Sequence, residues 1–551
     1  MSAPSHADSQ PAGPPAAGAA RPAAADLSDA AIERWPWIVS APTVDRLLRL
    51  RAERTPDAPL LIDESGTTLT CADADRRVSR VAAALAAQGI SAGTRVAWQL
   101  PTRISTVLVM LALRRLDAVQ APVIPLYRER EVGAALETSR AEFLLIPGTW
   151  KGVDFRAVAD AAAALAGCED LRVLEIGHDA PEADPEPAPL ASPDPDEPRW
   201  IYFTSGSTGR PKGALHSDTT LLVTARSFGG MGELNKVPGE IGAMGYPVAH
   251  VGGIEYLIAA LACGFPILLL EAFVPDQAVR LFRQYGVTTT GGAPPFYTAL
   301  LAMAAAQPGT PLLPSLRTLK GGGAPCPPDL VARVADELGA VLAHDYGMTE
   351  VPMVAIASPS DPSAVLAATD GRPIPDDHIR LVDDEGNVVT EQGGTGEVQV
   401  SGPGVCLGYT DPGENAAAFT ADGWFRTGDL GTVHPSGHLE IIGRLKDMII
   451  RKGENIAPQE IEALLAQHPA VAEVAVIGVP DADRGERVCA VVVPRADAEA
   501  PSLAALGEWL TGAGLMRQKL PERLEIVDAL PRTGLAKVAK AELRRRFGEN
   551  Q

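Results

Sequence analysis

The sequence predicts an α/β protein with a large N-terminal domain of sheets layered with helices. This domain is expected to carry a β-barrel-like subdomain and to be followed by a small α+β C-terminal domain on a hinge. Apolar runs alternate with helical patterns through the first half, hairpins begin near residue 378, and a separate set of elements starts beyond Gly443. Because one hydrophobic core rarely exceeds roughly 250–300 residues, a length of 551 residues also favours several domains.

The alternation in the first half indicates largely parallel sheets. Apolar residues between 104 and 111 follow the spacing of one helix face. The run 119–126 contains Pro122 and Pro125, which predicts a strand at the edge of a sheet. Residues 200–203 form a short apolar strand that leads into a glycine-rich loop.

Hairpin signals then replace the alternation. Residues 379–382 and 388–389 flank a cluster of turn residues, and a second turn lies at 435–437. Further on, Pro458 suits the first turn of a helix whose next residues have an apolar face. Residues 474–479 are typical of a buried strand. These elements predict the small α+β C-terminal domain.

Charge and cysteine content exclude several function classes. The formal net charge of −21 disfavours nucleic acid and anionic membranes, because binding to either needs clustered lysine and arginine. The 6 cysteines contain no C-x-x-C pair, so neither a zinc site nor a disulfide framework is expected.

Targeting signals are also missing from the sequence. Residues 1–25 are rich in alanine and proline without an apolar core, which predicts a disordered leader rather than a signal peptide. The most apolar stretch, 257–273, is interrupted by Gly264 and Pro266 and is too short to span a bilayer. We therefore expect a cytoplasmic protein.

The sharpest functional signal is the string TSGSTGRPKG at residues 204–213. Its glycines allow tight turns that direct backbone N–H groups into one concavity, and its hydroxyl groups and lysine add donors and charge. A glycine follows the lysine, so the string is not a Walker A loop. The predicted polyphosphate cradle comprises Thr204, Ser205, Gly206, Ser207, Thr208, Gly209 and Lys212.

This string resembles the phosphate loop of the adenylate-forming superfamily, which includes acyl-CoA synthetases, peptide-synthetase adenylation domains and firefly luciferase. Other segments resemble motifs of that family in the family's order, and the resemblance extends over residues 45–545. These segments are 321–325 (GGGAP), 345–350 (DYGMTE), 423–430 (GWFRTGDL), 443–447 (GRLKD) and 531–537 (PRTGLAK).

The resemblance implies a nucleotide site. Tyr346 would stack on the adenine, Thr349 would contact phosphate, and Glu350 would bind Mg²⁺, a hard cation that prefers oxygen ligands. Asp429 would accept hydrogen bonds from the ribose hydroxyls, with Arg444 beside it. The other implied ATP- or AMP-binding residues are Gly323, Ala324, Pro325, Asp345, Gly347 and Lys537.

The resemblance also implies a catalytic lysine and a hinge. Lys537 would be a mobile catalytic residue acting with Lys212, Thr349 and Glu350, although Ala536 replaces the family's glycine before it. Lys446 would be the pivot of a hinge at 444–447, between an N-terminal domain at 26–443 and a C-terminal domain at 448–551. Rotation about this hinge would bring Lys452 and Gly453 to a pantetheine tunnel.

An ATP-dependent carboxylic acid–CoA ligase is therefore the function implied, with ATP, Mg²⁺ and coenzyme A as cofactors or co-substrates. His250 and Gly253 lie in a segment similar to the family's acyl-pocket border. Peptide-synthetase domains have an aspartate there, so an amino acid is disfavoured. Gly252, Gly253 and 291–292 suggest room for a bulky acid. Residues 448–456 resemble medium-chain and alicyclic ligases, such as cyclohexanecarboxylate–CoA ligase, and the acid would be medium-chain, alicyclic or aromatic.

Two alternatives remain open at this point. The chain could adenylate an acid and load it onto a carrier protein, or it could be a catalytically silent nucleotide- or acyl-binding homologue. The expected partners are small molecules, and the sequence leaves open whether the protein is a monomer or a homodimer.

Overall fold

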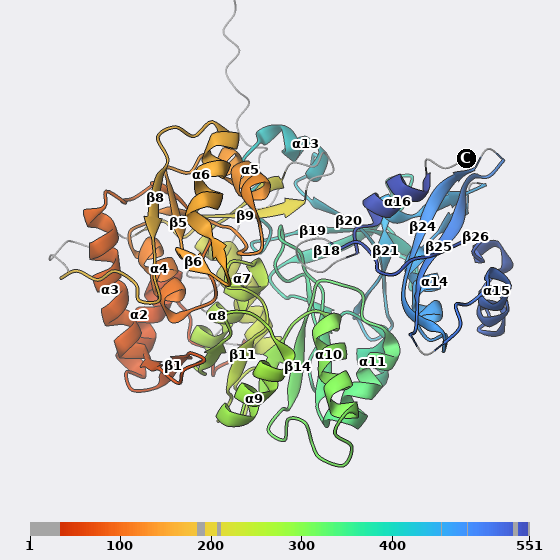
Figure 1. Ribbon diagram of the computed structural model, residues 1–551, viewed down its shortest axis with the longest axis horizontal. Helices are drawn as coiled ribbons and strands as arrows, with labels where there is room; N and C mark the ends of the chain where they lie inside the picture. The colour runs from red at the N-terminus through yellow and green to blue at the C-terminus, as the bar shows by residue number, and fades with distance from the viewer. Residues whose placement is uncertain are drawn as a thin grey trace, which may run out of the picture.

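The structure, a computed structural model, describes residues 34–184, 193–205, 211–452, 454–481, 483–496, 498–532 and 538–548 (Figure 1). The predicted leader, residues 1–25, lies outside this range. Figure 1 shows the C-terminal elements, in blue, gathered beside a larger body that the rest of the chain forms.

The largest sheet has 7 strands in the order β15-β14-β13-β11-β12-β1-β2. In that order they are Val341–Asp345, Thr318–Gly322, Thr289–Gly291, Gly242–Met244, Ile267–Leu269, Pro59–Ile62 and Thr68–Thr70. All neighbouring pairs are parallel except β1 and β2. The carboxyl ends of β11, β13, β14 and β15 therefore lie along one edge of this sheet.

A second sheet has 6 strands in the order β10-β9-β4-β3-β5-β8. They are Pro211–His216, Trp200–Ser205, Val119–Pro122, Arg95–Trp98, Phe143–Ile146 and Arg172–Glu175. The predicted edge position of β4 is wrong, because β4 pairs with both β3 and β9. Pro122 is the last residue of β4, so its missing N–H does not interrupt the strand.

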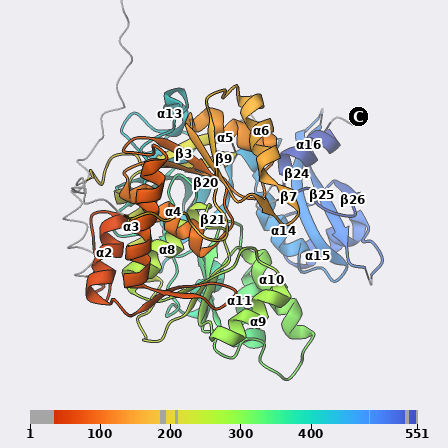
Figure 2. The same cartoon turned by 60° about the vertical axis from the view of Figure 1, so that its left-hand side comes forward.

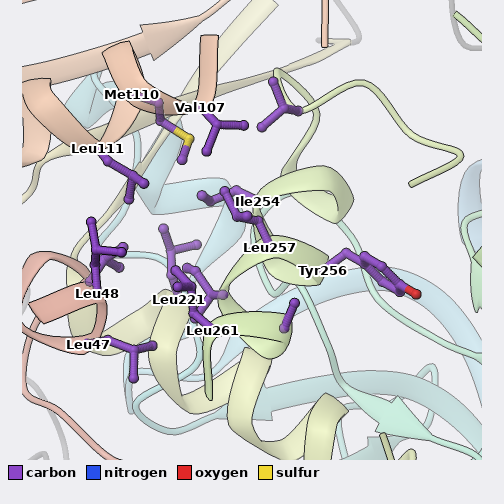
Figure 3. Packing of buried hydrophobic residues seen from close by; sticks show 14 of the residues in the cluster. Leu47, Leu48, Val107, Met110, Leu111, Leu221, Ile254, Tyr256, Leu257 and Leu261 are labelled. Atoms are coloured by element: carbon purple, nitrogen blue, oxygen red, sulfur yellow. The ribbon is translucent and has the colours of Figure 1, made fainter. Parts of the chain in front are cut away.

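Helices cover these sheets and also fill the space between them. They are α2 (Val44–Arg54), α3 (Cys71–Ala87), α4 (Ile104–Arg115), α5 (Glu129–Ser139), α6 (Phe155–Ala166), α7 (Asp218–Met231), α8 (Val251–Cys263), α9 (Pro275–Tyr285), α10 (Pro294–Ala305), α11 (Pro328–Arg333), α12 (Ser363–Ala368) and α13 (Asn415–Ala418). One core cluster joins α2, α4, α7 and α8 to strands of both sheets (Figure 3). The predicted helix at 104–111 is confirmed as part of α4. No helix in the described part of the chain is long and apolar enough to cross a membrane.

The β-rich subdomain is an antiparallel sheet of 4 strands in the order β18-β19-β20-β21. These strands are His378–Val382, Thr395–Ser401, Phe425–Val433 and Leu439–Arg444. The hairpin expected at 435–437 joins β20 to β21. Two short pairs complete the large body: β6 (Thr149–Trp150) with β7 (Val153–Asp154), and β16 (Ala355–Ile356) with β17 (Arg372–Pro373).

The C-terminal unit is a sheet between helices (Figure 2). Its strands are β22 (Ile449–Arg451), β23 (Glu454–Ile456), β24 (Val471–Asp481), β25 (Gly485–Pro494) and β26 (Arg523–Ile526), and its helices are α14 (Pro458–Leu465), α15 (Leu503–Gly512) and α16 (Lys540–Gly548). Val476 packs toward α14 and α15, whereas Ile477 packs toward α16. Because adjacent strand residues point to opposite faces, one strand serves both cores. The predicted α/β class with a small α+β C-terminal unit is confirmed.

Candidate functional site

Several predicted motifs meet at the carboxyl edge of the seven-stranded sheet. Strand β14 ends at Gly322 and β15 ends at Asp345, directly before Tyr346. Tyr246, which follows β11, donates its hydroxyl hydrogen to the carbonyl of Gly322 over 3.0 Å. Gly323 continues from β14 with a φ of +89°, a conformation that glycine adopts readily. Since ligands of open α/β sheets bind outside the carboxyl ends of the strands, this edge is the candidate site.

Asp345 does not fit the nucleotide contact that the sequence implied for it. Its Oδ1 lies 3.1 Å from Nζ of Lys320, and the two side chains are 1% and 0% exposed. The backbone N–H of Ala357 donates to the same oxygen over 3.0 Å. Burial raises the pKa of Asp345, and the charge of Lys320 opposes this shift. The Asp345 side chain therefore lies in the core below the site, where its pair with Lys320 connects β15 to β14.

Tyr346, Asp429 and Arg444 come together although they lie on separate segments. The Tyr346 hydroxyl donates to Asp429 Oδ2 over 2.7 Å, and Arg444 Nε lies 2.9 Å from Asp429 Oδ1. Asp429 and Arg444 are also cross-strand partners on β20 and β21. Burial, with the nearby Asp429 carboxylate, raises the pKa of Tyr346. The cluster is an acceptor site flanked by an aromatic ring and a cation, which suits a nucleoside.

Lys212 belongs to a second cluster on β10. Its Nζ lies 2.5 Å from Glu414 Oε2 and 5.2 Å from the centre of the Tyr409 ring. The Tyr409 hydroxyl donates to Glu350 Oε1 over 2.8 Å, so one tyrosine contacts Lys212 with its ring and Glu350 with its hydroxyl. Burial and the Glu350 carboxylate raise the pKa of Tyr409. Tyr409 and Glu414 were not predicted from the sequence, because neither residue lies in one of the motif segments named above.

The segment 346–350 connects the two clusters. Tyr346 contacts Asp429, Glu350 contacts Tyr409, and the backbone carbonyl of Thr349 accepts a hydrogen bond of 2.8 Å from His216 Nε2. Gly347 fits this segment because a Cβ there would lie only 2.0 Å from the carbonyl oxygen of Pro352. The segment 346–350 thus contacts the Asp429 cluster at one end and, at the other end, the tyrosine that lies against Lys212.

Other predicted residues can be placed only in part. Thr204, the cross-strand partner of Lys212, is half-buried on β9. Ala324 and Pro325 follow Gly323 at the same sheet edge. Of the remaining predictions, Gly206, Ser207, Thr208, Gly209, Gly453 and Lys537 lie outside the described residues, as does the side chain of Ser205.

Aromatic side chains line the same edge beyond the nucleoside-like cluster. Tyr246 and His250 stack with ring centres 5.4 Å apart, and Tyr246 meets Phe296 edge-on at 6.2 Å. Phe273 lies 4.7 Å from Phe296. His250 is also the N-cap of α8, where its Nδ1 accepts the backbone N–H of Gly252 over 3.0 Å. These four rings, which we call the aromatic wall, contact one another and include His250, which the sequence predicted at an acyl pocket.

Three of the four glycines expected to make room for the acid, Gly253, Gly291 and Gly292, are closely packed instead, which corrects the expectation for these three positions. A Cβ on Gly253 would lie 2.2 Å from the carbonyl oxygen of Pro247, and one on Gly291 would lie 2.5 Å from that of Lys320. At Gly292 it would meet the ring of Phe296 at 2.7 Å. The space beside these glycines is filled by backbone and by one ring, so the glycines permit close packing.

The predicted hinge lies between the two units. Residues Leu445–Asp447 form one turn of 3-10 helix between β21 and β22, and Lys446 is exposed. Asp447 pairs with Arg544 of α16 over 2.7 Å. Lys452 has a φ of +53° and donates its backbone N–H to the carbonyl of Arg484 over 2.8 Å, so the turn that carries it is tied to the residue directly before β25.

The donor set suits magnesium held together with a phosphate ligand. In the described ranges no group of three or more histidine, cysteine, aspartate or glutamate side chains could hold a metal ion. Glu350 offers hard carboxylate oxygens at the hydroxyl of Tyr409, whose ring Lys212 contacts. Mg²⁺ is usually bound by one or two carboxylates plus substrate phosphates rather than by a complete protein cage. The residues present therefore fit Mg²⁺ as a companion of ATP.

Comparisons with known proteins agree with this geometry. The sequence matches the AMP-binding enzyme family over residues 48–410 and the C-terminal domain of AMP-binding enzymes over residues 460–537. It is 36% identical to feruloyl-CoA synthase of Amycolatopsis sp, with 90% of this chain and 98% of the relative aligned. It is 30% identical to the medium-chain fatty-acid–CoA ligase of Escherichia coli (strain K12), with 90% and 88% aligned. The ATP-bound structure of MatB from Rhodopseudomonas palustris superposes with a TM-score of 0.82 at 28% identity and covers 92% of this chain and 99% of MatB.

Proposed function

Because the chain belongs to the AMP-binding enzyme family, that is, the adenylate-forming superfamily, we propose that it adenylates an aromatic carboxylic acid and transfers the acyl group to coenzyme A. Enzymes of this family use ATP with Mg²⁺, and its acyl-CoA ligases use CoA as co-substrate. The observation that carries the proposal is the segment 346–350, which joins the Tyr346–Asp429–Arg444 cluster to Lys212 and Glu350.

The first half-reaction joins two anions. A carboxylate must approach the α-phosphate of ATP, and two unit charges about 4 Å apart repel by roughly 4 kcal/mol at an effective dielectric constant near 20. In the proposed assignment, Lys212 neutralises phosphate charge, Asp429 orients the ribose and Lys537 supplies a second cation. Bound Mg²⁺, with Glu350 as its protein ligand, would supply further positive charge at the phosphates. The carboxylate displaces pyrophosphate, so no covalent enzyme intermediate is needed.

The aromatic wall supports an aromatic acid. Its members Tyr246, His250, Phe273 and Phe296 contact one another ring to ring. In the proposed assignment they border the acyl pocket, where stacked or edge-to-face contacts would favour a planar ring. Since backbone and the Phe296 ring fill the space beside Gly253, Gly291 and Gly292, the proposed pocket gains no width from these three glycines. A relative 36% identical to this chain is a feruloyl-CoA synthase, which also favours a phenyl-bearing acid over a medium-chain or alicyclic one.

AMP release tests the proposed reaction. Purified protein is incubated with Mg²⁺, ATP, CoA and a panel of cinnamic, benzoic, cyclohexanecarboxylic and C2–C12 straight-chain acids. We expect AMP and an acyl-CoA thioester in equal amounts, with the aromatic acids fastest. If AMP forms only when a phosphopantetheinylated carrier protein is present, the acceptor of the acyl group is the carrier protein and not CoA. An absence of acid-dependent pyrophosphate exchange across the panel would identify a silent binding protein.

We further propose that residues 444–447 are a hinge between an N-terminal domain at 26–443 and a C-terminal domain at 448–551. Replacing Lys446 by proline fixes φ and restricts Leu445 before it. We expect Lys446→Pro to slow thioester formation at least tenfold while acid-dependent pyrophosphate exchange falls less than threefold. Lys446→Ala keeps the backbone free and is the control. An equal loss in both half-reactions would reject the hinge.

A further inference from the structure

The segment that follows β19 is attached to the strand that carries Lys212. The N–H of Leu215 donates to the carbonyl of Gly408, and the N–H of Leu407 donates back to the carbonyl of Leu215, each over 2.8 Å. The N–H of Thr410 donates to the carbonyl of Gly213 over 2.8 Å. Residues 407–410 thus pair with β10 through these hydrogen bonds and an antiparallel bridge between Ala214 and Tyr409, which fixes the residues that follow them next to Lys212.

Glu414 is placed by this attachment. It ends the 3-10 turn Pro412–Glu414, which begins with Asp411 as its N-cap. The side-chain oxygen of the adjoining Asn415 accepts the backbone N–H of Tyr409 over 2.9 Å, so the turn is tied back to the segment 407–410. The Glu414 carboxylate then lies 2.5 Å from Lys212 Nζ, with side-chain exposures of 31% and 22%. The lysine expected at the phosphates is therefore already paired.

The charges near Lys212 do not favour an incoming polyphosphate. Glu414 contacts the ammonium group directly, and Glu350 accepts a hydrogen bond from the hydroxyl of Tyr409, over whose ring Lys212 lies. A polyphosphate anion must compete with Glu414 for Lys212 and is repelled by both carboxylates. Because the Lys212–Glu414 pair is partly exposed, it is weak enough to be displaced.

We propose that Glu414 is a positioning residue that holds Lys212 in the nucleotide-free enzyme and competes with the polyphosphate for it. This inference rests on the proposed function, since it takes Lys212 to bind phosphate. When ATP enters, Lys212 exchanges the Glu414 carboxylate for a phosphate. When pyrophosphate leaves, the pair forms again, so Glu414 shortens the lifetime of bound pyrophosphate. Only ion pairs are exchanged, and no covalent bond is made or broken.

Direct binding of pyrophosphate and of ATP, each with and without Mg²⁺, tests the inference. We expect Glu414→Gln to tighten the binding of both by about two- to fivefold, the range for losing a partly exposed ion pair. We also expect pyrophosphate to dissociate more slowly. Unchanged affinity would overturn the inference. So would weaker binding confined to samples with Mg²⁺, because that result makes Glu414 a metal ligand.

Two matched variants distinguish the effect of breaking the Lys212–Glu414 pair from the effect of removing one negative charge. Glu460→Gln removes a carboxylate from another lysine pair of 2.5 Å, with Lys519 in the C-terminal unit, and should leave affinity unchanged. Asp411→Asn removes the same charge from the turn that carries Glu414, and should change affinity less than Glu414→Gln does. Equal tightening by Asp411→Asn would show a general field effect and contradict the pairing. If wild-type protein binds neither probe, the proposed function fails; if wild type binds and Glu414→Gln does not differ from it, only this inference fails.

Discussion

Replacing Asp429 by alanine is expected to lower kcat/KM for ATP in acid-dependent pyrophosphate exchange by about 10²–10⁴-fold. The carboxylate is only 4% exposed and accepts from both Tyr346 and Arg444. In the proposed complex it also accepts from two ribose hydroxyls, and a hydrogen bond to a charged group contributes about 1.5–3 kcal/mol. The substitution removes both bonds and leaves Tyr346 and Arg444 without their acceptor.

Two companion variants make this result specific. Asp422→Asn changes another aspartate that pairs with an arginine, Arg380, but on the surface, and we expect exchange within twofold of wild type. Tyr346→Phe removes one hydroxyl and keeps the ring, so its loss should be smaller than that of Asp429→Ala. If Asp429→Ala leaves the nucleotide affinity unchanged, Asp429 is not part of the nucleotide site.

Lys320→Met is expected to produce the largest loss of stability, about 3–5 kcal/mol in the free energy of unfolding. Lys320 and Asp345 are buried together, and Oδ2 of Asp345 has no hydrogen-bond partner among the described residues. Removing the lysine leaves a buried carboxylate with no opposite charge. Burial already raises the pKa of Asp345, and losing Lys320 raises it further, so the defect should be largest at neutral pH and shrink as acid protonates the carboxyl.

Urea unfolding of the full chain at pH 7 and pH 5 measures this effect. Lys519→Met breaks an exposed lysine–glutamate pair and should cost less than about 1 kcal/mol. The double variant Lys320→Met/Asp345→Asn removes the buried charge and should recover part of the loss. If Lys320→Met unfolded at the same urea concentration as Lys519→Met, the buried pair would not have the role assigned to it.

Short-range patterns predicted the elements that depend on local sequence. Apolar spacing at 104–111 predicted the helix α4, and Pro458 marks the first residue of α14. The turn at 435–437 does connect two antiparallel strands. Each of these predictions rests on residues within one or two turns of each other. The proline rule failed for β4, because a strand's place in a sheet depends on partners elsewhere in the chain.

For the site, the motifs identified most of the residues that the fold brings together, among them Lys212, Tyr346, Glu350, Asp429 and Arg444. They did not reveal what these side chains contact. Asp345, expected at the nucleotide, is buried against Lys320. Of the glycines expected to widen a pocket, Gly253 and Gly291 are packed against backbone and Gly292 against the Phe296 ring. Tyr409 and Glu414, which flank Lys212, were not anticipated.

Residue order alone therefore established the α/β class, the two-unit plan and the adenylate-forming motifs. Each of these properties depends on contiguous segments of the sequence, in which residue spacing and residue type are enough to predict it. Folding in three dimensions set the burial of Asp345, the filling of space beside the glycines and the pairing of Lys212 with Glu414. The reason is physical: such contacts join residues from distant segments, and sheet register and core packing bring those segments together only in the folded chain.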